Sequence, residues 1–323
     1  MYGANYESWY QAFTEFVARN DVIVVVPNYR VGVFGYMNAN EENDDSANLF
    51  FVDIWQSLLW VRHNIESFGG DKGKITLGGQ SSGSMAISLI VKSPWVFKQS
   101  EIGEPLFQKV IMQSGIYYNH TFSDGAQVRK DVMRKVGCES FECLLEVDMN
   151  LLTNSTLSIT PTLDSNLIPM QPRDLQNYAI ENNFAQNIEY LVGYTSQESS
   201  ALVQNAVNLF VRSTSFEDFW ETLQRILVNL NSEMKPRSYS DEQMRASLLQ
   251  YFPFESFNEF TRKVTDLKTL KNSMLTLIND NDIFAPDLSA IQQLSKSGCK
   301  VFFYNFDFVT ENFRKEYRVI SFN

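Results

Sequence analysis

The chain has 323 residues, of which 44% are hydrophobic and 14% aromatic, so it can bury a large core. Its formal net charge is −11 at pH 7, and the acidic residues are spread along the chain. This balance disfavours nucleic acid and anionic membranes as main partners and predicts a globular protein.

The first strong secondary-structure signal is the β-branched run Val22–Val26, which is bounded by Asp21 and Pro27. A continuous apolar run of this kind is typical of a strand that is buried on both faces of a parallel sheet. It is also the longest apolar run in the chain and is far too short to cross a bilayer. We therefore expect a strand here and no membrane span.

A helix is predicted next, because Ile54, Leu58, Val61 and Ile65 recur at the spacing of one helical face. The glycine pair at 69–70 predicts where this helix ends.

A short β-rich run at 74–77 and a second glycine pair, Gly78-Gly79, follow the first helix. A further helix is predicted over 84–91, ended by Ser93-Pro94. The order strand, helix, strand, helix predicts an α/β fold with a doubly wound, mostly parallel sheet.

Three later apolar runs fit strands of the same sheet: 110–112, 190–192 and 301–304. Between about 215 and 282 the pattern changes to long helical stretches, where Ser240 and Gln243 have the spacing of a capping box. We interpret this part as a helical insertion or cap within one domain that spans 1–323.

The sharpest chemical signal is the sequence Gly79-Gln80-Ser81-Ser82-Gly83, which lies between a predicted strand and a predicted helix. A nucleophile elbow places its serine at such a turn, and the small residues at Gly79 and Gly83 let the backbone fold tightly. The backbone N–H of Ser82 would then donate to a developing oxyanion. The alternative reading is an ordinary Gly/Ser-rich loop.

An ordered series of residues around this motif resembles the type-B carboxylesterases and cholinesterases, which are α/β-hydrolases. The series comprises Asn28-Tyr29-Arg30-Val31-Gly32, Asn48, Asp53, Trp60-Val61, Asn64-Ile65, Phe68-Gly69-Gly70-Asp71, the elbow, Phe107, Gln113-Ser114-Gly115, Gly137-Cys138, Cys143-Leu144, Pro161, Asp164, Gly193, Asp280, Pro286 and Tyr304-Asn305-Phe306. The resemblance covers nearly all of this chain but only the middle of a full family domain. Gln80 and Ser82 depart from it, since the family usually has Glu and Ala at those places.

The resemblance implies a Ser-His-Glu triad in which Ser81 is the nucleophile and Glu198 is the acid. Glu198 follows Gly193 in the place of the family's acid, although Ser199 replaces the usual glycine. The alternative for Glu198 is an exposed loop residue.

The resemblance also implies a histidine beyond the Tyr304–Phe306 strand and a glycine-rich oxyanion loop upstream of Asn28, and the sequence has neither. Of its two histidines, His63 is expected on a solvated helix face and His120 in a loop. The strands that the family places before Val22 are also missing, so we expect an unpaired sheet edge, exposed apolar surface and poor solubility.

The resemblance further implies a disulfide bond between Cys138 and Cys143, with a reduced pair as the alternative. Cys299 precedes an apolar strand and is expected to be a buried or free thiol. Asn119 and Asn154 begin glycosylation sequons, which are used only in secretory proteins. No signal peptide opens the chain, and we expect secretion or the endoplasmic reticulum lumen ahead of the cytoplasm.

Two functional hypotheses from different classes remain at this point. The first is a hydrolase of small-molecule carboxylic esters that acts through an acyl-enzyme, with no cofactor and no metal, seen here as a truncated chain. The second is a catalytically inactive family member that binds or adheres to partner proteins. The substrate cannot be assigned because aromatic residues such as Trp95, Tyr117 and Trp220 fit a core or a surface equally well.

Overall fold

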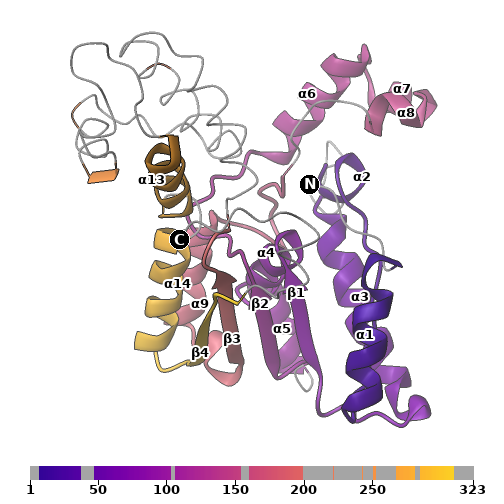
Figure 1. Ribbon diagram of the computed structural model, residues 1–323. Coiled ribbons are helices and arrows are strands. Elements are labelled where there is room, and N and C mark those ends of the chain that lie inside the picture. The colour runs from indigo at the N-terminus through magenta and orange to yellow at the C-terminus, as the bar shows by residue number, and fades with distance from the viewer. Residues whose placement is uncertain are drawn as a thin grey trace, which may run out of the picture.

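The computed structural model describes residues 7–37, 47–102, 106–153, 160–198, 221, 242, 250–251, 267–280 and 284–308. Within these ranges the elements follow the expected alternation of helices and strands (Figure 1). In chain order they are α1 (Glu7–Arg19), α2 (Val33–Tyr36), α3 (Leu49–Asn64), η2 (Ile65–Phe68), β1 (Thr76–Gln80), α4 (Ser82–Ile90), α5 (Pro94–Ile102), β2 (Lys109–Gln113), α6 (Gly125–Val136), α7 (Phe141–Glu146), α8 (Met149–Thr153), α9 (Pro172–Glu181), η3 (Ala185–Asn187), β3 (Glu189–Thr195), α13 (Leu267–Asn279), α14 (Ala285–Lys296) and β4 (Lys300–Phe306).

The four described strands form one parallel sheet in the order β1-β2-β3-β4, which confirms the α/β class. Helices lie in every connection between these strands, as parallel pairing requires. Because β1 lies at one end of this order, it has a single neighbour among the described strands. All carboxyl ends of the strands meet at one edge of the sheet.

The two faces of the sheet differ in burial. Val110, Met112, Tyr190, Val192 and Tyr194 point to one face and are at most 3% exposed.

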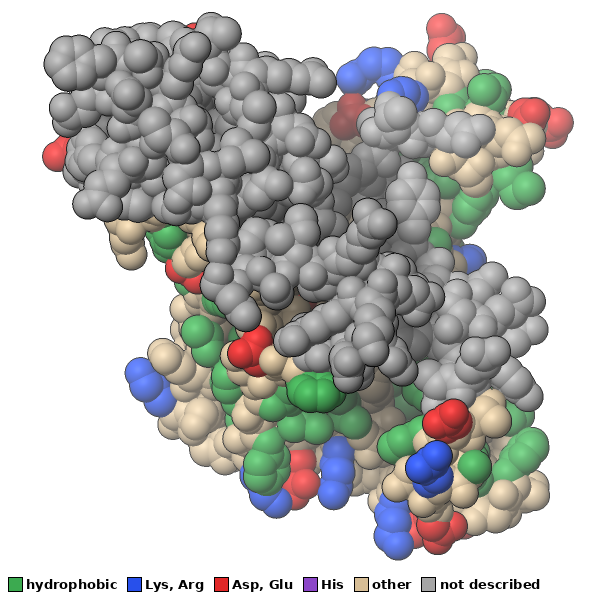
Figure 2. All heavy atoms as spheres, in the orientation of Figure 1, with side chains coloured by type: hydrophobic (Ala, Val, Ile, Leu, Met, Phe, Trp, Pro, Cys, Tyr) green, Lys and Arg blue, Asp and Glu red, His purple; other side chains and the backbone are tan. Residues whose placement is uncertain are grey.

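On the other face the alternate side chains remain open. Leu191 is 38%, Phe302 52% and Phe306 53% exposed. Figure 2 shows hydrophobic side chains at the surface in this part of the molecule. Parallel sheets are normally covered on both faces, so the apolar exposure that the sequence predicts is present among the described residues.

The predicted strand at Val22–Val26 is wrong. These residues form an extended segment outside the sheet, and Val22, Ile23, Val25 and Val26 are 41–44% exposed. A β-branched run favours an extended backbone, but a strand also needs a neighbour that accepts its hydrogen bonds. None of the four described strands pairs with this segment.

An ion pair fixes the end of this extended segment to α3. The backbone N, Nε and Nη2 atoms of Arg30 donate to the carboxylate of Asp53, at 2.9, 2.8 and 2.7 Å. The same guanidinium lowers the pKa of Asp53, chiefly through the side-chain hydrogen bonds. The ion pair thus fixes the chain at Arg30 to α3.

The predicted helix at 54–65 is confirmed as α3 and η2, and Gly69 ends it with a φ of 84°. Its buried face packs Trp55 edge-on against Trp95 of α5, with ring centroids 5.1 Å apart. Trp95 is therefore partly buried and packs against the core. Most of the predicted insertion at 215–282, including Ser240, Gln243 and Trp220, lies outside the described residues; α13 lies within it.

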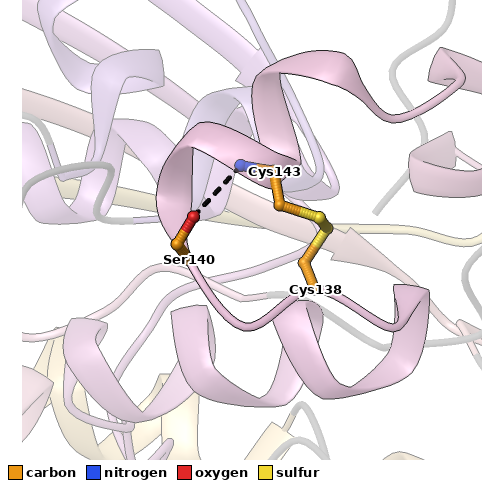
Figure 3. The surroundings of a disulfide bond; sticks show 3 residues. All are labelled: Cys138, Ser140 and Cys143. Atoms are coloured by element: carbon orange, nitrogen blue, oxygen red, sulfur yellow. Dashed lines mark hydrogen bonds between the residues drawn. A yellow bond between two sulfur atoms is a disulfide. The ribbon is translucent and has the colours of Figure 1, made fainter.

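Cys138 and Cys143 form a disulfide bond between the end of α6 and α7 (Figure 3). Ser140 is the N-cap residue of α7, and its hydroxyl oxygen accepts from the Cys143 N–H at 3.3 Å (Figure 3). These helices and α8 project from the body of the molecule (Figure 1). Cys299 is a buried free thiol, as predicted.

We expect replacement of both Cys138 and Cys143 by serine to lower the free energy of unfolding by about 2 kcal/mol, because the bond closes a short loop. Urea unfolding of the double variant and the parent chain measures this difference. Cys299→Ser is the control for loss of a thiol without loss of a cross-link. A double variant that is as stable as the parent would show that the disulfide bond does not stabilise the folded chain.

Candidate active site

Ser81 lies between the end of β1 and the start of α4, as the elbow motif predicts. Its backbone has φ 53° and ψ −121°, a region that residues other than glycine rarely adopt. Its N–H donates to the Gln113 carbonyl of β2 at 2.8 Å, and its own carbonyl accepts from the Met85 N–H at 2.9 Å. The turn is therefore held from the sheet and from the helix, with the serine exposed.

The two elbow glycines have different roles. A Cβ atom on Gly79 would lie 2.6 Å from the Gly83 carbonyl carbon and 2.7 Å from its oxygen. Gly79 is therefore required by the close approach of two backbone segments. A Cβ atom on Gly83 would have the Tyr29 hydroxyl oxygen as its nearest neighbour, at 3.8 Å.

Ser82 is the first residue of α4, so its N–H has no carbonyl within the helix to accept from it. The positive end of the helix dipole lies at the same place. These two features suit the donor role predicted for Ser82, beside the nucleophile.

Glu198 follows the end of β3 and is half-buried. Its Oε1 atom accepts two hydrogen bonds, from the Ser114 hydroxyl at 2.7 Å and from the Thr195 N–H at 2.6 Å. Both bonds fix the orientation of the carboxylate. Ser114 itself follows the end of β2 and has a φ of 61°.

Ser81, Ser114 and Glu198 thus follow three neighbouring parallel strands at the same edge of the sheet. The Ser81 N–H donates to Gln113, and the Ser114 N–H donates to the Gly193 carbonyl at 2.9 Å. Strands in a sheet are about 4.8 Å apart, so the ends of β1 and β3 are separated by roughly 10 Å. That separation leaves room for an imidazole between nucleophile and acid.

Sequence reasoning gave Ser114 no role. The available signal was a serine directly after a strand, as at the elbow, together with a place in the ordered resemblance.

The histidines lie elsewhere along the chain. His63 is exposed in the last turn of α3. His120 packs edge-on against Tyr117, with ring centroids 4.7 Å apart. The triad base is therefore not assigned to either residue.

Comparison with known proteins matches the carboxylesterase family model to residues 2–321. The chain belongs to the carboxylesterase family. Its members share the α/β-hydrolase fold, in agreement with the parallel sheet and its connecting helices.

Proteins similar to this chain include a carboxylesterase, an acetylcholinesterase and a para-nitrobenzyl esterase. Carboxylesterase 3B of Mus musculus is 26% identical over 309 residues, covering 92% of this chain and 49% of the relative. Acetylcholinesterase of Danio rerio is 26% identical over 317 residues, covering 90% and 44%. Para-nitrobenzyl esterase of Bacillus subtilis is 29% identical over 268 residues, covering 78% and 52%. The chain spans about half the length of these relatives.

The remaining predicted site residues are only partly described. Asn119 is half-buried, and its Oδ1 atom accepts from Arg173, whose guanidinium lies over the Tyr118 ring. Asn154 lies outside the described residues. Within the described ranges no helix is long and apolar enough to span a membrane, and no group of His, Cys, Asp and Glu side chains could hold a metal ion.

Proposed function

We propose that the protein carrying this carboxylesterase-family chain hydrolyses small-molecule carboxylic esters, with Ser81 as nucleophile and Glu198 as triad acid. The observation that supports this most is the position of both at the same edge of the sheet, after β1 and β3, with β2 between these strands. Ser81 is exposed on a strained turn, and Glu198 is oriented by Ser114 and Thr195.

In this mechanism a histidine removes the proton from the Ser81 hydroxyl as it attacks the ester carbonyl. Glu198 holds the imidazole in one tautomer and stabilises its cationic form. The Ser82 N–H donates to the oxyanion of the tetrahedral intermediate. Collapse releases the alcohol and leaves an acyl-Ser81, which water hydrolyses to the acid. The mechanism uses no cofactor and no metal.

The test is covalent labelling with a fluorophosphonate, applied to protein expressed from the complete transcript. We expect one label per chain, located on Ser81 by peptide mass spectrometry. Ser81→Ala should abolish labelling, and Ser82→Ala should retain it, because the N–H of residue 82 belongs to the backbone. A folded protein that stays unlabelled would exclude the esterase mechanism.

A second candidate is a family member that binds partner proteins without catalysis. Ser81 and Glu198 would then be retained without a chemical role. If this candidate is right, the protein expressed from the complete transcript should fold but should not react with the fluorophosphonate.

Folding in the secretory pathway is part of the proposal. The Cys138–Cys143 disulfide supports it, because such bonds persist in oxidising compartments. Glycosylation at Asn119 would give further support. The net charge of −11 favours small esters over nucleic acid as partners.

A further inference from the structure

The segment 114–117, called here the bridging segment, follows β2 and begins with the residue that contacts Glu198. At its start the Ser114 hydroxyl donates to Glu198 Oε1 at 2.7 Å. Ser114 has a φ of 61°, which is unfavourable for a residue other than glycine. Such a conformation persists only where surrounding groups hold it. The position of the Ser114 hydroxyl therefore depends on the groups that contact the bridging segment.

Serine side chains of α4 form hydrogen bonds with the backbone of the bridging segment. The Ser84 hydroxyl donates to the Gly115 carbonyl at 2.6 Å. The Ser88 hydroxyl oxygen accepts from the Tyr117 N–H at 2.9 Å, and the same hydroxyl donates to the Met85 carbonyl at 2.7 Å. Because its hydrogen is engaged by Met85, Ser88 acts towards Tyr117 as an acceptor only.

Lys92, in the turn that follows α4, adds a third hydrogen bond, from its Nζ atom to the Tyr117 carbonyl at 3.0 Å. Ser84, Ser88 and Lys92 recur at every fourth position, so they share one face, and they are at most 2% exposed. A buried helix face is normally apolar, and alanine is the better helix former. The two hydroxyls are therefore explained by their bonds to the bridging segment and not by the needs of the helix.

The bridging segment also packs against the elbow. A Cβ atom on Gly115 would lie 3.1 Å from Met85 Cγ and 3.3 Å from the Ser81 carbonyl oxygen. That carbonyl accepts from the Met85 N–H in the first turn of α4, at 2.9 Å. The helix that begins directly after Ser81 therefore holds the segment that begins with Ser114.

We propose that Ser84 and Ser88 are positioning residues that hold the bridging segment on α4. Through this segment they fix the Ser114 hydroxyl against Glu198, and thereby set the acid relative to the nucleophile that precedes the same helix. The inference rests on the proposed function, because it takes Ser81 as the nucleophile and Glu198 as the acid.

A role in stability alone makes a different prediction. Buried backbone groups need hydrogen-bond partners wherever they lie, so loss of either hydroxyl should destabilise the chain in any case. Ser93 provides the comparison, because its buried hydroxyl donates to the Leu167 carbonyl at 2.8 Å. Neither of these two residues belongs to the bridging segment. Ser93→Ala is therefore the matched control for loss of a buried hydroxyl that bonds to the backbone.

The experiment compares Ser84→Ala, Ser88→Ala and Ser93→Ala with the parent, each expressed from the complete transcript. The rate of fluorophosphonate labelling at Ser81 is measured over a range of reagent concentrations. We expect all three variants to melt below the parent. The maximal labelling rate should fall about tenfold in the two α4 variants and stay unchanged in the control. The half-saturating reagent concentration should not change, because a misplaced Glu198 slows the reaction and not the binding.

A double-mutant cycle tests whether Ser84 acts through Ser114. Ser114→Ala removes the donor to Glu198 and should itself slow labelling. In that background Ser84→Ala should slow labelling no further, while its effect on the melting temperature should remain. Equal slowing in both backgrounds would show that Ser84 reaches the nucleophile by another route, and the inference would be overturned.

Hydrogen exchange tests the bridging segment independently of labelling. The Tyr117 N–H should exchange about tenfold faster in Ser88→Ala, which removes its acceptor, and at the parent rate in Ser93→Ala. Ser84→Ala should also speed this exchange, because it releases the preceding carbonyl at Gly115. Mass spectrometry of overlapping peptides measures the exchange at this amide.

Parent-like exchange or parent-like labelling in both α4 variants overturns the inference. If one of the two variants does not fold, the other decides by the same readings. A parent protein that does not label at Ser81 contradicts the proposed function instead. Exchange at Tyr117 then decides whether Ser84 and Ser88 hold the bridging segment.

Discussion

Replacement of Glu198 by glutamine is expected to slow the reaction of Ser81 with a fluorophosphonate by about 10⁴-fold, the size of effect seen when a triad acid becomes an amide. Glutamine has the same shape, and its Oε1 atom can still accept from Ser114 and Thr195. The fold should therefore persist, while the charge that stabilises an imidazolium is lost. Single-turnover labelling with a fluorophosphonate measures the rate, and circular dichroism checks the fold.

Glu189→Gln is the matched control for this change. Glu189 begins the strand that Glu198 follows, and it forms ion pairs with Lys109 and Lys300 at the opposite edge of the sheet. These pairs are exposed, so their loss should have a small, salt-sensitive effect on stability and none on labelling. Equal labelling rates for Glu198→Gln and the parent would remove Glu198 from the triad.

The elbow could be predicted from sequence because its determinants are local. Gly79 and Gly83 flank Ser81 within one short turn, and the strand and helix on either side have their own periodicity. The same holds for α3, whose apolar stripe and terminal glycine are contained in one stretch of chain. Glu198 has no local signature of this kind, and it was found through the ordered resemblance.

Interactions between distant segments were not predictable in the same way. The sequence shows Asn48 and Asp164 only as members of the ordered series, yet Asn48 donates to Asp164 across 116 positions of sequence. Ser114 is 84 positions from Glu198. The spacing of Ser84 and Ser88 is visible in the sequence, but their hydrogen bonds to the backbone of Gly115 and Tyr117 depend on how the segment after β2 packs against α4.

The error at Val22–Val26 has a related cause. Local propensity specifies an extended conformation, whereas sheet membership depends on a neighbouring strand. The described strands provide no such neighbour, so the residues with the strongest β-signal remain outside the sheet. Propensity and pairing are separate requirements, and only the first is contained in a short sequence window.

Gly79→Ala is expected to lower the free energy of unfolding by about 3 kcal/mol, because its Cβ would press on backbone atoms that cannot move aside. The clash, at 2.6 Å from the Gly83 carbonyl carbon, would displace the turn that carries Ser81. Labelling at Ser81 should fall with it, since loss of elbow geometry moves both the hydroxyl and the Ser82 N–H.

Gly78→Ala provides the comparison one residue earlier in the same strand. A Cβ atom on Gly78 would have Ile111 Cβ as its nearest neighbour, at 3.9 Å, which is ordinary contact. Alanine there should leave labelling unchanged and leave stability the same or slightly higher, because it restricts the unfolded chain. Chemical denaturation and labelling of both variants measure the contrast. Similar behaviour of the two variants would mean that the elbow tolerates a side chain at Gly79, and that its geometry does not depend on this close backbone approach.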